Sequence, residues 1–320
     1  MLRKVTDALK DKNGFIYSIE LIPPLVQKGT ESLYGTVEKF MGIKPPVFVS
    51  LTYHQQHLDI GKTEDGTGYQ ANLSLERPGT IMLSHRLAEE YPIIVIPHII
   101  CGGFSVHETQ AALVELGYAG NINTVLALRG DPPYPYRDFK PAREGHSHAS
   151  QLVKQIANLR ERKYVGKESG VPVDFEIGVA AYPERHKEAP NFEWDLKWLK
   201  EKQELGADFA ITQMFFDNEQ YKRFLDQCEK QGITIPIIPG ITPIIRKDQL
   251  IVLPHRFGCT IPDGLVERIQ NAKDEDVKKI GIEFTVKQSQ GLMESGAPII
   301  HFFTYGAPKT VQEIVKQLSQ

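Results

Sequence analysis

The sequence has few cysteines and lacks a long apolar run. Its three cysteines, Cys101, Cys228 and Cys259, lie far apart and include no C-x-x-C pair. This excludes a disulfide framework and favours a reduced, cytoplasmic protein. No apolar run reaches the roughly 18 residues of a membrane span. The first residues, MLRKVTDALKDKNG, contain no apolar core of a secretory signal. We therefore expect no membrane partner.

An excess of charge of one sign is also missing. The 320 residues include 37 Lys+Arg and 40 Asp+Glu, for a formal net charge of −3. Nucleic-acid-binding domains usually carry a strongly basic face, so this balance argues against a nucleic-acid partner. Hydrophobic residues make up 41% and charged residues 24% of the chain. This composition is typical of a globular protein and excludes collagenous or mostly disordered chains.

Short apolar, β-branched runs alternate with amphipathic segments along the whole chain. The predicted strands are 15–21, 47–52, 93–99, 124–128, 175–181, 209–215, 235–238 and 299–304. The predicted helices are 80–91, 106–116, 150–162, 192–205, 218–231, 274–294 and 310–318, and Gly117, Gly206 and Gly232 mark helix ends. Eight strands alternating with helices predict an α/β protein, a (β/α)₈ TIM barrel formed as a single domain by residues 1–320. An open doubly wound sheet is the alternative. The longest irregular stretches are 54–79 and 131–149.

Functional residues of a TIM barrel gather where its strands end. Polar side chains at these positions include Glu20, His98, Asp131 and Gln213. Glu20 stands out because it lies in an otherwise apolar strand, YSIELIPP, where burial should raise the pKa of its carboxyl group. A carboxyl group with a raised pKa suits general acid catalysis. For Asp131, a local ion pair with Arg129 is an equally open interpretation.

Other chemistries find less support at the strand ends. A Schiff-base aldolase needs a lysine there, and none of the eight predicted strand ends has one. The close histidine pairs, His54 with His57 and His146 with His148, lie in loops, so we expect no metal site. Residues 66–71, GTGYQA, match G-x-G-x-x-A but follow the charged stretch GKTED instead of a strand. We interpret them as a flexible loop and not as a dinucleotide-binding turn.

Six motifs together resemble the methylenetetrahydrofolate reductase family over nearly the whole chain. They are YSIELIPP (17–24), ALRGDPP (127–133), AAYPERHKEA (180–189), GADFAITQMFFD (206–217), IIPGITP (237–243) and HFFT (301–304). The resemblance implies a TIM barrel that binds FAD at the strand ends and reduces 5,10-methylenetetrahydrofolate to 5-methyltetrahydrofolate. NADH or NADPH would reduce FAD and leave before the folate binds, in a ping-pong sequence. The resemblance also implies a cytoplasmic oxidoreductase of one-carbon metabolism and methionine biosynthesis. We expect the protein to form a homo-oligomer.

The resemblance also implies residue roles. Glu20 would be the acid that opens the methylene bridge, Asp131 would lie beside flavin and pterin and tune the flavin, and Gln213 would bind the folate. The positions that match FAD contacts in the family are Thr52, His98, Arg129, Gly130, Asp131, His148, Ala149, Tyr182, His186, Asp195 and Lys202.

The chain departs from the family pattern at several of these places. His148 stands where tyrosine is common, and Trp198 and Glu201 replace polar or basic residues of the FAD-binding helix. After Thr304 the common Asn-Arg is missing, and Lys309 is the nearest base. We expect no appended regulatory domain. The preference for NADH or NADPH stays open.

Two other functions remain as alternatives. One is a flavin-free barrel lyase or hydrolase that uses Glu20 and Asp131 as an acid/base pair. The other is a non-catalytic folate- or flavin-binding relative, against which the combination of Glu20, Asp131 and Gln213 argues.

Overall fold

The computed structural model describes residues 3–10, 14–133, 136–166 and 170–320. Nine parallel strands form one sheet in the order β10-β11-β1-β2-β5-β6-β7-β8-β9. Their bounds are β1 (Tyr17–Leu21), β2 (Phe48–Leu51), β5 (Ile94–Ile100), β6 (Thr124–Leu128), β7 (Glu176–Ala181), β8 (Phe209–Thr212), β9 (Ile237–Ile238), β10 (Gly240–Ile241) and β11 (Ile300–Phe303). The strands at the two ends of this order, β9 and β10, are consecutive in the chain. The sheet is therefore a nearly closed barrel, which confirms the predicted TIM barrel and excludes the open sheet.

Pro239 divides the seventh barrel strand into β9 and β10. Proline has no N–H group and therefore cannot donate to a neighbouring strand. Its carbonyl oxygen still accepts a hydrogen bond from the His301 backbone N–H at 2.9 Å. The next residue, Gly240, donates its N–H to Thr212 Oγ1 at 2.8 Å. These two hydrogen bonds keep the strand joined to β11 and β8 at the break, alongside the pairing of β9 with β8 and of β10 with β11.

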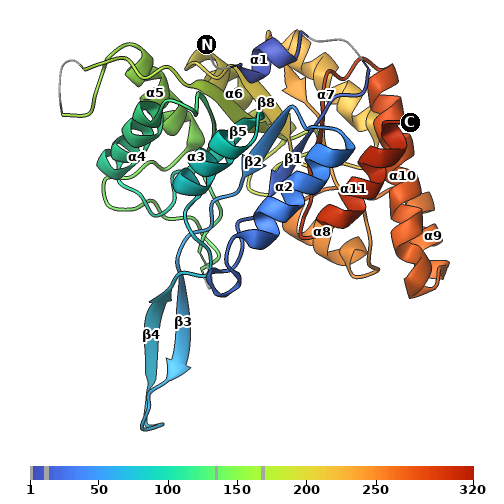
Figure 1. The fold of residues 1–320 in the computed structure, drawn as a ribbon, viewed down its shortest axis with the longest axis horizontal. Helices are drawn as coiled ribbons and strands as arrows, with labels where there is room; N and C mark the ends of the chain where they lie inside the picture. The colour runs from blue at the N-terminus through green and yellow to red at the C-terminus, as the bar shows by residue number, and fades with distance from the viewer. Residues whose placement is uncertain (1–2, 11–13, 134–135, 167–169) are drawn as a thin grey trace.

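Helices cover the outside of the barrel (Figure 1). Their bounds are α1 (Val5–Ala8), α2 (Glu31–Ile43), α3 (Thr80–Glu90), α4 (Val106–Ala119), α5 (Ala149–Arg160), α6 (Phe192–Glu204), α7 (Asn218–Lys230), α8 (Gln249–Phe257), α9 (Asp263–Asn271), α10 (Asp274–Glu294) and α11 (Pro308–Leu318). All seven predicted helices are present, and α1, α2, α8 and α9 are additions. Within the described part of the chain, none of these helices is both long and apolar enough to cross a bilayer.

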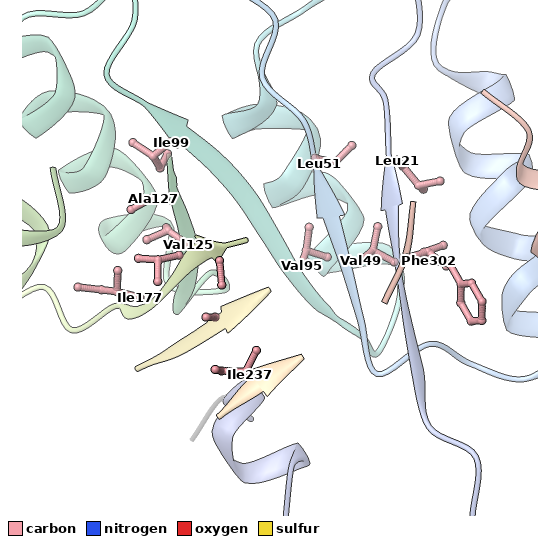
Figure 2. Close-up of a cluster of buried hydrophobic side chains, with 14 of the residues drawn as sticks. Leu21, Val49, Leu51, Val95, Ile99, Val125, Ala127, Ile177, Ile237 and Phe302 are labelled. Carbon is pink, nitrogen blue, oxygen red and sulfur yellow. The ribbon is translucent and has the colours of Figure 1, made fainter. Parts of the chain in front are cut away.

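Alternate residues of each strand pack outward against the helices. Figure 2 shows this layer, which includes Leu21, Val49, Val95, Val125 and Phe302. All five are at most 3% exposed. Burying a side chain of this kind contributes roughly 1.5–3 kcal/mol. Because side chains alternate along a strand, the residues between them, such as Ser18, Glu20 and Ser50, point into the barrel.

The N-terminal end of the barrel is filled. Phe48, Ile96, Leu126 and Phe209 form a buried cluster there with Val5 of α1. The buried carboxylate of Glu176 accepts hydrogen bonds from the backbone N–H groups of Val5 and Thr6, at 2.7 and 2.8 Å. These are unpaired N–H groups of the first turn of α1, so the carboxylate fixes the helix over this end. A ligand cavity is therefore left to the C-terminal end of the strands.

The interpretation of residues 66–71 as a flexible loop is wrong. Residues 57–74 form an antiparallel hairpin of β3 (His57–Lys62) and β4 (Tyr69–Ser74) that projects from the barrel (Figure 1). Opposite pairs such as Leu58–Leu73 and Ile60–Ala71 place apolar residues on one face. The turn between the strands carries the charged and glycine-rich residues that obscured this alternation.

The predicted helix end at Gly117 is also wrong. Helix α4 continues to Ala119 and ends at Gly120, which has a left-handed φ of 79°. Gly117 serves packing instead, because a Cβ atom there would lie 2.3 Å from Val173 Cγ1. Gly206 and Gly232 do follow helices α6 and α7, with φ of 111° and 69°.

Candidate active site

A cavity of about 1180 Å³ opens at the C-terminal ends of the barrel strands. Such a volume exceeds that of a typical small-molecule site and suits a large cofactor together with a substrate. Every residue that the sequence predicted for the site lines this cavity: Glu20, Thr52, His98, Arg129, Gly130, Asp131, His148, Ala149, Tyr182, His186, Asp195, Lys202 and Gln213. The structure thus brings the whole set together, although their individual roles stay predictions.

Glu20 is held at the inner wall of the cavity by the ends of two strands. It lies in β1 beside Ser50 of β2 and Phe303 of β11. Its backbone carbonyl accepts a hydrogen bond from Thr304 Oγ1 at 2.8 Å. The neighbouring residues Ile19 and Leu21 anchor the outer face of β1 in the core. This leaves the Glu20 carboxyl group directed inward on a rigid strand.

The surroundings of Glu20 favour its neutral form. Burial raises the pKa of Glu20 to about 8. The nearest titratable partner is His98, whose Nε2 lies 3.6 Å from Glu20 Oε2 and has no hydrogen-bond partner among the described residues. Burial, with a smaller effect of His54, lowers the pKa of His98 to about 3. At neutral pH both groups are therefore uncharged, and Glu20 carries a proton that it can donate.

Asp131 does not depend on Arg129 for its position. The guanidinium group of Arg129 instead forms a two-pronged ion pair with Glu188, at 2.5 and 2.8 Å. Gln55 Nε2 donates to the backbone carbonyl of Asp131 at 2.8 Å. The Asp131 carboxylate faces the cavity from an exposed position. The ion-pair partner of Arg129 is therefore Glu188, and the interpretation of Asp131 as that partner is wrong.

Asp195 and Lys202 lie on α6 with their polar atoms already bonded. Asp195 Oδ2 accepts from the backbone N–H of His186 at 2.9 Å, which fixes the turn after β7. Lys202 Nζ donates to the carbonyl of Ala180 at 2.7 Å. Burial lowers the pKa of Lys202 to about 8 and raises that of Asp195. Both side chains thus hold the backbone of β7 and of the turn after it in place on this wall of the cavity.

The aromatic and helix-terminal positions form the neighbouring part of the wall. The rings of Tyr182 and His186 pack edge to face, with centroids 4.7 Å apart. His148 directly precedes α5, and Ala149 is its first residue. A helix N-terminus presents free N–H groups that suit a phosphate group. Trp198 and Glu201, the two departures on α6, also line the cavity.

Gln213 lies at the end of β8, the strand next to β7 in the barrel. Its side-chain Oε1 accepts from the Met214 backbone N–H at 2.9 Å. Its own N–H donates to the carbonyl of Ala181 at 2.8 Å. These bonds orient the side chain so that its amide NH₂ group is the part available to a ligand.

Several lining residues were not foreseen as site residues, and three of them lie together. Arg256 and Phe257 come from the last turn of α8, and Tyr305 follows β11. Arg256 Nη1 donates to the hydroxyl oxygen of Tyr305 at 3.1 Å. Tyr305 lies just beyond the predicted strand 299–304, and no motif marks a site at the end of α8. The structure therefore supplies a cation near the place where the family's Asn-Arg is missing.

The histidine pairs do not extend to a metal centre among the residues that the structure describes. That part of the chain has no cluster of three or more His, Cys, Asp or Glu side chains arranged to hold a metal. His54 instead lies at the cavity, with Nε2 2.9 Å from Thr52 Oγ1. Burial, more than nearby charges, lowers its pKa to about 4.

Comparison with known proteins decides the family. The family model described as methylenetetrahydrofolate reductase matches residues 4–319. The chain belongs to the methylenetetrahydrofolate reductase family. It is 31% identical to a 5,10-methylenetetrahydrofolate reductase of Buchnera aphidicola, over 98% of this chain and 94% of that relative.

Members of the methylenetetrahydrofolate reductase family from eukaryotes are longer. The chain is 31% identical to methylenetetrahydrofolate reductase 1 of Schizosaccharomyces pombe, over 98% of this chain but 48% of that protein. It spans about half the length of this and similar relatives from yeast, worm and plants. Relatives carry names with NADPH or with NADH.

A solved structure supports the barrel fold of this family member. It is an uncharacterised protein of Clostridium thermocellum, described as binding two copies of 5-methyl-5,6,7,8-tetrahydrofolic acid. The two folds superpose with a TM-score of 0.60 at 15% identity, over 98% of this chain and 99% of that one. At this identity the likeness is evidence for the fold alone.

Proposed function

We propose that this chain is an FAD-dependent methylenetetrahydrofolate reductase that uses NADH or NADPH. The observation that carries the proposal is the position of the Glu20 carboxyl group on the inner wall of a large cavity, where burial raises its pKa. Opening the methylene bridge of the substrate requires a proton for the departing amine nitrogen. A carboxyl group with a pKa of about 8 retains that proton at neutral pH.

The cavity residues fit FAD. The N–H groups at the start of α5 suit its pyrophosphate, and the Tyr182 ring, held edge to face against His186, offers an aromatic surface. Lys202 adds a positive charge on the same wall. When bound, FAD supplies the hydride-accepting and hydride-donating chemistry. The chain itself holds the cofactor against the substrate, excludes water and provides the proton from Glu20.

Gln213 is placed to bind the substrate in this proposal. It lines the same cavity as Glu20, and its amide NH₂ group can donate to the pterin ring. NAD(P)H and the folate would then occupy the same space in turn, as the ping-pong sequence requires. A cytoplasmic, homo-oligomeric enzyme remains our prediction.

Flavin binding tests the proposal first. We expect about one non-covalently bound FAD per chain, released by denaturation and measured by its absorbance. Stoichiometric FMN, or no flavin affinity after reconstitution, would contradict the proposal. The second outcome would favour the flavin-free lyase or hydrolase that uses Glu20 and Asp131.

The Asp131→Asn variant is expected to have a higher flavin midpoint potential. A carboxylate at this end of the cavity opposes negative charge on reduced flavin, and the amide does not. A shift of about 30 mV corresponds to about 1.4 kcal/mol in a two-electron couple and is measurable. Redox titration compares this variant with Asp138→Asn, an exposed residue of the same loop outside the cavity. An unchanged or lower potential in Asp131→Asn would contradict the electrostatic role.

A further inference from the structure

The cavity carries more acidic than basic side chains. Seven Asp or Glu side chains line it, the neutral Glu20 among them, against three Lys or Arg side chains. An anionic ligand in such a cavity needs a cation near its charged end. The hydrogen bonds and ion pairs that these three cations already form therefore indicate which of them can bind the charged end of the ligand.

Two of the three cations are already engaged by the protein. Arg129 uses both terminal nitrogens in its ion pair with Glu188. Lys202 donates to the Ala180 carbonyl from a buried position. Arg256 differs, because it contacts the Tyr305 hydroxyl oxygen and the rings of Phe257 and Tyr305. Among the described residues it forms no ion pair with a carboxylate, and most of its N–H donors are left for a ligand.

Arg256 lies on the substrate side of the cavity. Helix α8 follows β10, Tyr305 follows β11 and Gln213 follows β8, whereas Arg129 follows β6. Met214, next to Gln213, belongs to the same apolar cluster as Phe257, Phe303 and Tyr305. The end of the cavity nearest Gln213 is therefore walled by aromatic rings and carries one unpaired guanidinium group.

The local backbone supports a functional role for this corner. Tyr305 has a φ of 41°, in the left-handed region that a bulky residue rarely occupies. Its ring packs edge to face on Phe257 at 5.7 Å, and its hydroxyl oxygen holds Arg256. Strained residues that are held in this way concentrate at ligand-binding sites.

We propose that Arg256, held by Tyr305, binds a glutamate carboxylate of the folate tail. In a folate, a flat benzoyl ring separates the pterin from this glutamate. The aromatic wall fits the benzoyl ring. The Arg256 guanidinium group lies at that wall, where it can bind the glutamate carboxylates that follow the ring. The inference rests on the proposed function, because it assigns the tail of that substrate. A guanidinium–carboxylate pair at such a half-open site should be worth about tenfold in affinity.

The test compares two ligands on the FAD-loaded protein by calorimetry. One is 5-methyltetrahydrofolate, and the other is the same molecule with both glutamate carboxylates converted to amides. We expect the wild type to bind the acid about tenfold more tightly than the diamide. The Arg256→Gln variant should bind both with similar affinity. Arg246→Gln is the matched control, since Arg246 pairs with Asp248 outside the cavity, and it should discriminate as the wild type does.

Each outcome separates this inference from the proposed function. If Arg256→Gln still prefers the acid as strongly as the wild type does, the tail carboxylate binds elsewhere and the inference fails alone. If the variant loses affinity for both ligands equally, Arg256 supports the cavity wall instead, and the inference also fails. If the wild type binds neither ligand, the proposed folate substrate fails together with the inference.

Discussion

The Glu20→Gln variant is expected to transfer hydride to methylenetetrahydrofolate at least about 100-fold more slowly than the wild type. Glutamine preserves the shape and hydrogen bonding of the side chain but cannot act as a carboxylic acid. Reduction of the bound flavin by NAD(P)H needs no acid at the folate, so this half-reaction should stay close to the wild-type rate. Stopped-flow absorbance of the flavin measures both half-reactions on one preparation.

The pH dependence of the folate half-reaction gives this prediction a second readout. The raised pKa of about 8 means that Glu20 is protonated below that pH and ionised above it. The wild-type rate should therefore be level up to about pH 8 and then fall about tenfold per pH unit. The Glu20→Gln variant should lack this fall, because it has no proton to lose at that position.

Two outcomes would contradict the catalytic role of Glu20. If both half-reactions slow equally, Glu20 positions the cofactor or supports the fold. If neither slows, another group supplies the proton. Glu193→Gln serves as the control, because Glu193 is an exposed carboxylate of α6 that does not line the cavity.

The Gly281→Ala variant is expected to unfold more easily than the wild type, by about 1–3 kcal/mol. Gly281 lies in α10, and a Cβ atom there would be 1.7 Å from the backbone oxygen of Ile244. A methyl group must therefore push α10 away from the segment that joins β10 to α8. Because α8 carries Arg256, the same displacement should also weaken folate binding.

Gly264→Ala is the matched control for this substitution. Gly264 lies in α9, and a Cβ atom there would meet no atom within 4 Å. Alanine has the higher helix propensity, so this variant should equal or exceed the wild type in stability by up to about 1 kcal/mol. Urea unfolding of the three proteins measures the difference. Equal stability of Gly281→Ala and the wild type would show that α10 adjusts without strain.

Most of the barrel could be predicted because its strands are fully buried. Such strands read as short, continuous β-branched runs, and each of the eight predicted runs contains barrel strand. The run 209–215 continues three residues beyond β8, which ends at Thr212. There the Met214 N–H turns to the Gln213 side chain instead of a neighbouring strand. The apolar residues that follow are buried by packing outside the sheet, which a hydrophobicity pattern does not distinguish.

The projecting hairpin could not be predicted in the same way. Its strands pack against no core, and Ile60, Tyr69 and Leu73 are 63–75% exposed. The apolar alternation is short and is interrupted by a turn rich in charge and glycine. The two strands are recognised only from their mutual pairing, which is a contact between residues up to 17 positions apart.

The candidate site was predictable where its residues follow barrel strands. Asp131 and Gln213 do so, Glu20 and His98 lie within the C-terminal halves of β1 and β5, and the cavity includes all four. Arg256 lies instead at the end of a helix, and its relation to Tyr305 depends on how α8 folds back over β11. The Glu188 partner of Arg129 likewise comes from a turn 59 residues away. Contacts of this kind arise from tertiary structure and leave no local pattern.

The most direct test of the proposed function is product formation by the FAD-loaded protein without oxygen. The protein is mixed with NADH or NADPH and 5,10-methylenetetrahydrofolate, and 5-methyltetrahydrofolate is quantified by chromatography. We predict one 5-methyltetrahydrofolate for each NAD(P)H oxidised, and no product from protein freed of FAD. Flavin reduction by NAD(P)H without any 5-methyltetrahydrofolate, or equal turnover of the substrate without FAD, would contradict the assignment.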